Sequence, residues 1–465
     1  MDIFEKTWKQ IKTHYGITGC AFVLVKNGKP YMKKCFGIAD LKTGRPITSK
    51  SFFDIASCSK AFTTCLGAQL CDEGKMDWDT PVINYYPDFK IYDKYAEKHI
   101  TPRDMASHRS GLSRHDLVRQ EVLADRADYI SRIEYYVPSC GFREKMQYQN
   151  QIYAALGYIE EKIDGKIWED MIIERIAKPL DMEVEFRGLS DLKGKDAALP
   201  HEIIDGKATQ VNYNICSSNN PCGGIKTNID SIEHWLLMLT NKGVYNSKTL
   251  ISEKQYNEIK KPVIYINEPA INSNDKQKCY SLGWMPSIYK GRRLISHGGS
   301  IQGFNSAVGF LPDEGNGFAF FTNTGSTPIC EIFKYVLVDY LNGECEDDYE
   351  YLMLNQLERA KKAAILKAEK YNNLKPAEPF EIQKYCGTYY NDGYHNIVIS
   401  ENNQHDLEVS FADCKSIIRK NSDNIFLGEF ENAEIDIDIR FNQDGSGAIM
   451  SFSENYSPTV FVKTK

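Results

Sequence analysis

Two predicted β-hairpins, at opposite ends of the first 340 residues, restrict the folds open to this chain more than any other feature. Residues 19–40 form two apolar strand patterns around Asn27 and Gly28, the strongest short signal for a hairpin. Residues 304–324 contain a second hairpin pattern, which follows a strand pattern at residues 292–297. Most segments between them have helical periodicity. This arrangement predicts an α+β fold, in which one antiparallel sheet joins the early and late segments, helices flank it, and a helical insertion forms a cleft beside it.

The last quarter of the chain has the composition of a separate module. Residues 350–371 are rich in Ala, Leu, Glu and Lys and contain no Gly or Pro, which predicts an exposed connecting helix. Seven or eight short alternating strand patterns follow within residues 378–465, a segment with 15 acidic and 7 basic residues. We therefore expect an α+β domain over residues 1–345, a helical linker over residues 346–377, and a small antiparallel β-barrel or sandwich over residues 378–465.

Charge and cysteine usage exclude several classes of function. The net charge is −7 and there is no basic tract, so neither nucleic acid nor an anionic membrane is an expected partner. No apolar run approaches the roughly 18 residues that span a bilayer, and the charged N-terminus lacks the apolar core of a secretory signal, so we expect a cytoplasmic protein. The 13 cysteines form no CxxC pair and no zinc spacing, which predicts reduced thiols. We expect neither a metal nor a cofactor, since no Gly-rich phosphate loop occurs either.

The tetrad SCSK, from Ser57 to Lys60, opens a long apolar pattern with helical spacing. A serine hydroxyl is a weak nucleophile and needs a neighbouring base. Residues three apart share a helix face, so Lys60 would lie one turn from Ser57, and a lysine desolvated in a cleft can accept its proton. The alternative is an ordinary helix start whose serine caps the first turn. Three further Ser-x-x-Lys matches do not open such a helix, namely those at Ser190, Ser273 and Ser287.

Tyr148 and Asn150 are a second pair of candidates, just before the helical pattern of residues 151–163. A tyrosine at this place could pass a proton between a nucleophile and a leaving group. Asn150 could donate to a substrate carbonyl and contact Lys60. The alternative is a packed tyrosine followed by a helix-capping asparagine. His108, in the stretch SHRSGL, is predicted to be a structural turn histidine rather than a base.

The stretch SHGGSIQGF, just before the second hairpin, supplies a third group of candidates. Gly298 and Gly299 at the end of a strand would let a substrate backbone approach closely. The backbone N–H of Ser300 would face that of Ser57, which lies among the free donors of its helix N-terminus, and the two would form an oxyanion hole. The alternative is a glycine-rich strand end with His297 on the surface.

The order of these motifs resembles that of a known family. Ser-x-x-Lys at Ser57, Tyr-x-Asn at Tyr148 and His-x-Gly at His297 are similar to the three motifs of the class C β-lactamase-related serine hydrolases. This group includes penicillin-binding DD-peptidases, D-aminopeptidases and carboxylesterases. Stretches such as TGRPITSKSFFDIAS and GGIKTNIDSIEHWLLML are similar to it as well, and the resemblance covers roughly residues 15–340.

The resemblance implies a serine hydrolase with a β-lactamase/DD-peptidase-like fold, which forms an acyl-enzyme on Ser57 from small amides, peptides or esters. Lys60 and Tyr148 would handle the serine proton. The substrate site and its oxyanion hole would then be lined by Asn150, His297, Gly298, Gly299 and Ser300, together with the Ser57 N–H.

The histidine at position 297 narrows the expected substrates. The family's lysine at this position suits the carboxylate of a β-lactam or of a peptide C-terminus, whereas a histidine is largely neutral at pH 7. His297 is therefore more typical of D-aminopeptidases and esterases. The alternatives are a β-lactamase or penicillin-binding DD-carboxypeptidase, and a non-catalytic binding protein on the same fold.

The tail resembles the lipocalin-like domains that follow some members of this group. Such a domain would cover the cleft or build a homo-oligomer, and nothing in the sequence chooses between these roles. Besides a second copy of the chain, the partner that we expect is a small-molecule, peptide or ester substrate.

Overall fold

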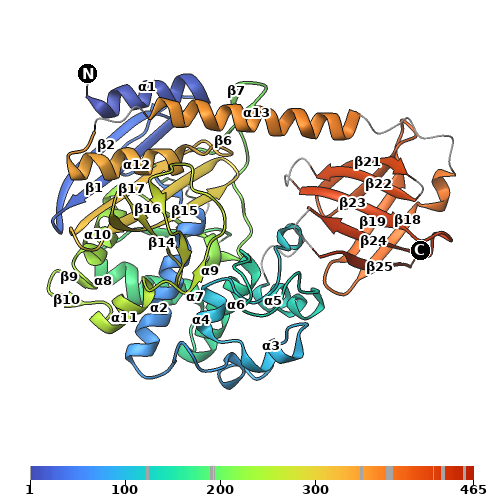
Figure 1. Ribbon diagram of the computed structural model, residues 1–465, viewed down its shortest axis with the longest axis horizontal. Coiled ribbons are helices and arrows are strands. Elements are labelled where there is room, and N and C mark those ends of the chain that lie inside the picture. The colour runs from blue at the N-terminus through green and yellow to red at the C-terminus, as the bar shows by residue number, and fades with distance from the viewer. Residues whose placement is uncertain are drawn as a thin grey trace.

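The computed structural model describes residues 2–121, 125–188, 192, 194–345, 349–372, 381–422, 424–430, 435–453 and 457–464. Figure 1 shows a large body of sheet and helices, a long helix that leaves this body, and a β-barrel at the C-terminal end. The predicted domain boundaries, after residues 345 and 377, border on or lie within segments outside the described residues, so the three-part division stays a prediction.

An antiparallel sheet of eight strands joins the early and late parts of the chain, which confirms the predicted α+β fold. Its order is β12-β14-β15-β16-β17-β1-β2-β3, and the strands in chain order are β1 (Gly19–Lys26), β2 (Lys29–Asp40), β3 (Arg45–Pro46), β12 (Asp275–Lys276), β14 (Met285–Tyr289), β15 (Arg292–Ile301), β16 (Phe304–Leu311) and β17 (Asn316–Thr322). The early and late segments meet where β1 pairs with β17 and Phe22 lies opposite Phe320. Asn27 and Gly28 both have positive φ, as a type I′ hairpin turn requires.

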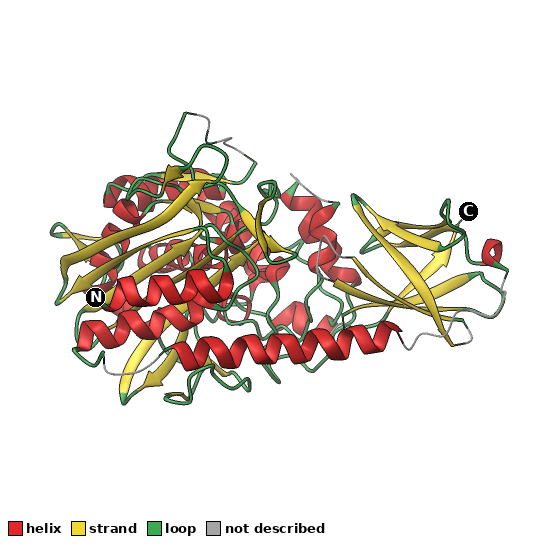
Figure 2. Cartoon of the chain, turned by 90° about the horizontal axis from the view of Figure 1, so that it is seen from above, coloured by secondary structure: helices red, strands yellow, loops and turns green. Residues whose placement is uncertain are grey.

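Helices cover both faces of the sheet because the side chains of β1 alternate between two apolar clusters. Phe22 and Leu24 pack into the outer cluster, and Ala21 and Val23 pack into the inner one. The outer layer contains α1 (Ile3–Tyr15), α12 (Ile329–Asn342) and the start of α13 (Glu350–Asn372). Figures 1 and 2 show these three helices side by side. The inner layer contains α2 (Lys60–Asp72) and α10 (Ile229–Thr240).

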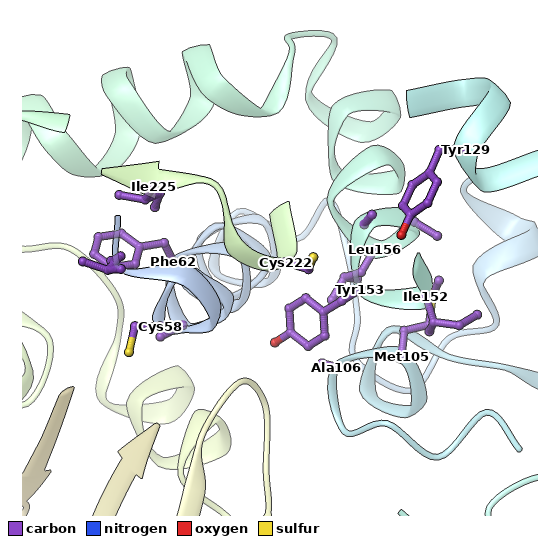
Figure 3. Close-up of a cluster of buried hydrophobic side chains, with 14 of the residues drawn as sticks. Cys58, Phe62, Met105, Ala106, Tyr129, Ile152, Tyr153, Leu156, Cys222 and Ile225 are labelled. Atoms are coloured by element: carbon purple, nitrogen blue, oxygen red, sulfur yellow. The ribbon is translucent and has the colours of Figure 1, made fainter. Parts of the chain in front are cut away.

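The inner layer continues into the helical insertion. Figure 3 shows part of the core that joins them, with Phe62 of α2 and Tyr153 of the insertion among its buried side chains. The remaining α-helices are α3 (Lys94–His99), α4 (Pro102–Ala106), α5 (Arg126–Ser131), α6 (Asn150–Asp164), α7 (Trp168–Ile172), α8 (Lys178–Leu180), α9 (Asn220–Gly223) and α11 (Glu253–Ile259). The 3₁₀ turns are η1 (Ala56–Ser59), η2 (Val82–Asn84), η3 (Asp116–Gln120), η4 (Arg132–Tyr135) and η6 (Ile382–Lys384), with a π-turn η5 (Ile173–Ala177).

Short strands accompany the insertion in small separate sheets. These strands are β4 (Phe53–Asp54), β5 (Val184–Phe186), β6 (His201–Ile204), β7 (Lys207–Gln210), β8 (Ile225–Thr227), β9 (Val244–Tyr245), β10 (Lys248–Thr249), β11 (Ile264–Tyr265) and β13 (Cys279–Tyr280). No helix in the described part of the chain is both long enough and apolar enough to cross a bilayer.

The C-terminal module is a closed barrel of eight strands, which confirms the predicted all-β tail. Its strands are β18 (Gly387–Asn391), β19 (His395–Glu401), β20 (Leu407–Phe411), β21 (Cys414–Ser422), β22 (Ile425–Phe430), β23 (Ile435–Phe441), β24 (Gly447–Phe452) and β25 (Thr459–Lys463). Alternate side chains fill the barrel, among them Tyr389 and Phe441. Helix α13 connects the barrel to the body: Met353 near its start is buried in the outer cluster, and Lys367 Nζ lies 2.6 Å from Glu429 Oε1 of the barrel.

Candidate active site

Ser57 lies in the 3₁₀ turn η1, and α2 begins only at Lys60, so the expected continuous helix from Ser57 is shorter than predicted. The turn is tight because Asp54 Oδ1 accepts the N–H of Ala56 at 2.9 Å, and Ala56 has a left-handed φ of 45°. Arg187 holds Asp54 with two hydrogen bonds of 2.7 and 2.8 Å. Ser57 caps neither η1 nor α2, so the helix-capping alternative is wrong.

Lys60 is buried, and its Nζ has three hydrogen-bond acceptors. These are Cys222 O at 2.7 Å, Asn150 Oδ1 at 2.9 Å and Ser57 Oγ at 3.2 Å. The Ser57 contact places the amine within proton-transfer distance of the serine hydroxyl. This arrangement is suited to removing the serine proton.

Asn150 is fixed from its other end by Asp116, a residue that the sequence analysis did not single out. Gln149, rather than Asn150, caps α6, because its side chain accepts the N–H of the second helical residue at 2.6 Å. Asn150 Nδ2 is therefore free to donate to Asp116 Oδ1 at 3.0 Å. Burial raises the pKa of Asp116, but the charge of Arg114 and the bond from Asn150 outweigh it and hold the pKa below its usual range. The ionised carboxylate thus turns the oxygen of Asn150 toward Lys60.

Tyr148 presents its ring to Lys60. Lys60 Nζ lies 4.7 Å from the ring centroid, within the range of a cation–π contact. Arg114 approaches the same ring, with its Cζ 5.3 Å from the centroid. Within the described residues no hydrogen bond joins the Tyr148 hydroxyl to Ser57, so Lys60 is the group in direct contact with the serine.

His297 is buried, so the surface-histidine alternative is wrong. Its Nδ1 lies 2.6 Å from Gly298 O and its Nε2 2.8 Å from Tyr280 Oη, which in turn lies 3.2 Å from His108 Nε2. His108 Nδ1 accepts the N–H of Gln149, so His108 donates through Nε2 to Tyr280, and Tyr280 donates to His297. Burial, reinforced by the Lys60 charge, lowers the pKa of His297 to about 3 and that of His108 well below its usual value. Both rings are therefore neutral near pH 7.

The two glycines after His297 differ in what surrounds them. At Gly299 a Cβ would lie 2.2 Å from Ile55 O and 2.3 Å from Ser306 Oγ, so strand β15 lies directly against the turn that carries the predicted nucleophile. At Gly298 a Cβ would instead meet Glu331 Oε1 at 2.9 Å. Only the first position requires a residue without a side chain for close backbone packing.

Ser300 lies where β15 has a free edge. It is opposite Asn305 in β16, next to the pair of Ile301 and Phe304 that closes the hairpin. Since hydrogen-bonded and non-bonded pairs alternate from the closing pair, the Ser300 N–H points away from β16. On its other side β15 pairs with β14 only as far as Ser296. This edge borders the pocket that contains Ser57.

The predicted residues meet at a cavity of about 1250 Å³. Ser57, Tyr148 and residues 297–300 line it, while Lys60 and Asn150 are buried behind Ser57. Residues that sequence reasoning missed line it too, among them Glu331 of α12 and, from the barrel, Ser453, Ser457 and Pro458. In the part of the chain that the structure describes, no group of His, Cys, Asp or Glu is arranged to hold a metal ion.

Glu331 places a negative charge on the pocket wall beside Gly298. Its Oε2 accepts a hydrogen bond from Lys334 Nζ at 2.7 Å. Burial raises its pKa, but the charges of Lys334 and Lys278 outweigh this and lower the pKa below its ordinary value. The carboxylate is therefore ionised at neutral pH.

Comparison with known proteins agrees with this geometry. A family model described as Beta-lactamase matches residues 4–334. "Unguisins hydrolase ungD'" of Aspergillus campestris is 26% identical over 438 residues, which cover 89% of this chain and 79% of that protein. "Protein flp" of Staphylococcus aureus (strain MW2) is 22% identical over 331 residues, which cover 70% of this chain and 64% of that protein.

Solved structures share the whole architecture. The octameric penicillin-binding protein homologue from Pyrococcus abyssi has a TM-score of 0.64 at 16% identity, covering 99% of this chain and 100% of that one. SurE has a TM-score of 0.60 at 17% identity, covering 99% and 98%. At these identities the likeness shows the fold alone.

Proposed function

This chain belongs to the β-lactamase family, and from that premise we propose that it is a serine hydrolase that forms an acyl-enzyme on Ser57. The observation that carries the proposal is the 3.2 Å contact from Lys60 Nζ to Ser57 Oγ, made by an amine whose other hydrogen-bonding positions are already occupied. The relative from Aspergillus campestris is itself named a hydrolase.

In the proposed reaction, Lys60 accepts the proton of Ser57 as Oγ attacks the substrate carbonyl carbon. The N–H groups of Ser57 and Ser300 stabilise the resulting oxyanion. Lys60, with Tyr148 beside it, delivers the proton to the leaving nitrogen or oxygen as its bond to the carbonyl carbon breaks, which leaves an ester on Ser57. A water then gives a proton to Lys60 and attacks this ester, and Lys60 returns the proton to Ser57 as the acid product leaves.

The proposed substrates are small amides, peptides or esters without a carboxylate next to the scissile bond. His297 is neutral and its Nε2 accepts from Tyr280, so it has no positive charge to offer a substrate carboxylate. Such a carboxylate near Gly298 would also meet the like charge of Glu331. These charges favour an activity like that of D-aminopeptidases or esterases over that of a β-lactamase or DD-carboxypeptidase.

The proposal is tested by intact-protein mass spectrometry and hydrolysis assays with a panel of D- and L-aminoacyl amides, simple esters and β-lactams. SurE was solved with D-Leu, so D-leucine amide belongs in this panel. We expect a covalent adduct and turnover in the wild type and in Ser273→Ala, an exposed serine of another Ser-x-x-Lys match. Ser57→Ala should show neither. Equal activity in both variants would refute the nucleophile, and rapid turnover of β-lactams alone would refute the substrate class.

We propose further that copies of this chain assemble through the outer wall of the barrel. Tyr390 lies opposite Val462, and Ile449 lies opposite Val460, and all four apolar side chains are exposed. The penicillin-binding protein homologue from Pyrococcus abyssi is octameric. Light scattering should give a multiple of the 53.1 kDa chain mass for the wild type and a smaller particle for Val460→Lys. A wild-type monomer would refute this assembly.

A further inference from the structure

Hydrogen bonds join the barrel to the body beside the candidate active site. Tyr394 Oη of the barrel lies 2.7 Å from His115 Nδ1 of the insertion. Tyr136 stacks on the His115 ring, with centroids 3.9 Å apart and planes 8° apart, and its hydroxyl donates to Gly393 O at 3.1 Å. Two consecutive barrel residues are thus bonded to two stacked rings of the body.

This junction is buried on both sides. Tyr394 is 0% exposed, His115 2% and Tyr136 1%. On the barrel side the Tyr394 ring stacks on Phe452, with centroids 4.7 Å apart, so the barrel core holds the hydroxyl in place. Burial lowers the pKa of His115 to about 3. The bond therefore joins two neutral groups and persists across the neutral pH range.

The segment that contacts the barrel is linked to Lys60 by a chain of hydrogen bonds. His115 precedes Asp116 in the chain, and Asp116 Oδ1 accepts from Asn150 Nδ2 at 3.0 Å. Asn150 Oδ1 accepts from Lys60 Nζ at 2.9 Å, and the same nitrogen contacts Ser57 Oγ. A movement of the His115 backbone therefore moves the carboxylate that orients Asn150.

We propose that Tyr394 is a positioning residue for Lys60. The docked barrel holds His115, and through Asp116 and Asn150 it keeps the lysine amine aimed at Ser57. The barrel thus positions a catalytic group, and it also lines the pocket with Ser457 and Pro458. This inference rests on the function proposed above.

Tyr394→Phe in the full chain removes the bonding hydroxyl but keeps the packed ring. Tyr389→Phe is the matched control, because Tyr389 is equally buried in the barrel and its hydroxyl donates to Tyr385 O of the barrel itself. We expect kcat for an activated ester to fall about tenfold or more in Tyr394→Phe with KM within about twofold, since misplacement of a catalytic group lowers the chemical step. Tyr389→Phe should retain wild-type kcat.

Two further measurements separate coupling from a general loss of stability. If Tyr394 acts through Asp116, adding Tyr394→Phe to Asp116→Asn should lower kcat no further than Asp116→Asn alone. Amide hydrogen exchange of residues 111–121 should be faster in Tyr394→Phe than in Tyr389→Phe. Multiplicative effects on kcat, or equal kcat and equal exchange in the two tyrosine variants, would overturn the proposal. A wild-type protein that is not acylated at Ser57 would instead refute the proposed function, and the exchange experiment would still decide whether the barrel braces this segment.

Discussion

Replacing Gly299 by alanine should remove most of the hydrolytic activity. The added Cβ would lie 2.2 Å from Ile55 O and 2.3 Å from Ser306 Oγ, where ordinary contacts begin at 3.4 Å. Strand β15 must therefore move by about 1 Å from the turn that carries Ser57. Ser300 follows Gly299 directly, so this movement separates the two N–H groups of the proposed oxyanion hole. A displacement of about 1 Å in an active site costs roughly 10²-fold in rate, similar to the loss of one oxyanion donor.

Gly298→Ala is the matched control, because its Cβ would meet only Glu331 Oε1, at the end of a side chain that can move. The assay measures kcat for a p-nitrophenyl ester, together with chemical unfolding of each variant. We expect kcat to fall about 10²-fold in Gly299→Ala, and overpacking to lower the free energy of unfolding by about 1–3 kcal/mol. Gly298→Ala should stay close to wild type. Equal kcat in the two variants, measured well below their unfolding transitions, would refute the placement of the oxyanion hole.

Two further predictions concern charge. The pKa values of His108, His115 and His297 are lower in the folded chain than the ordinary 6.5, so the unfolded chain binds more protons as the pH falls. Their contribution to stability is complete above about pH 6.5 and is lost toward pH 3, with a slope of up to about 4 kcal/mol per pH unit for three groups. Urea unfolding at pH 7, 6 and 5 measures this slope. His297→Gln should lower the slope by the contribution of about one proton. An unchanged slope would contradict a neutral, buried His297. Glu331→Gln should raise kcat/KM several-fold for an ester that carries a carboxylate, relative to a neutral ester. An unchanged ratio would show that Glu331 does not select against anionic substrates.

Local signals were sufficient to predict the architecture and the Ser57–Lys60 pair. The apolar run of β1 and the turn at Asn27 and Gly28 depend only on neighbouring residues, and a spacing of three places Ser57 beside Lys60 in any helical turn. A 3₁₀ turn in place of the first α-helical turn therefore did not disturb the pair. The choice between Gln149 and Asn150 as the cap of α6 was not predictable, because adjacent polar residues can each supply it.

The supporting residues could not be predicted for a different reason. Tyr280 bonds to His297 across 17 residues, Asp116 to Asn150 across 34, and Tyr394 to His115 across 279. No periodicity or motif connects residues at such separations. Their roles depend on tertiary packing, which brings an ordinary aspartate or tyrosine to a place where its charge or hydroxyl has a partner.

The position of β1 in the middle of the sheet has a consequence for how the chain is made. Its first seven residues are buried, yet its partner β17 comes late: Thr18 N and Thr324 Oγ1, which bond at 3.0 Å beside this pair, are 306 residues apart. At about 5–20 residues per second, roughly 15–60 s pass between the synthesis of these two segments. During that interval the edge of β1 that later pairs with β17 is exposed outside the ribosome, where it can associate with other nascent chains. The yield of native protein should therefore depend on chaperones that bind its N-terminal 40 residues, and unassisted refolding of the full chain should be slow.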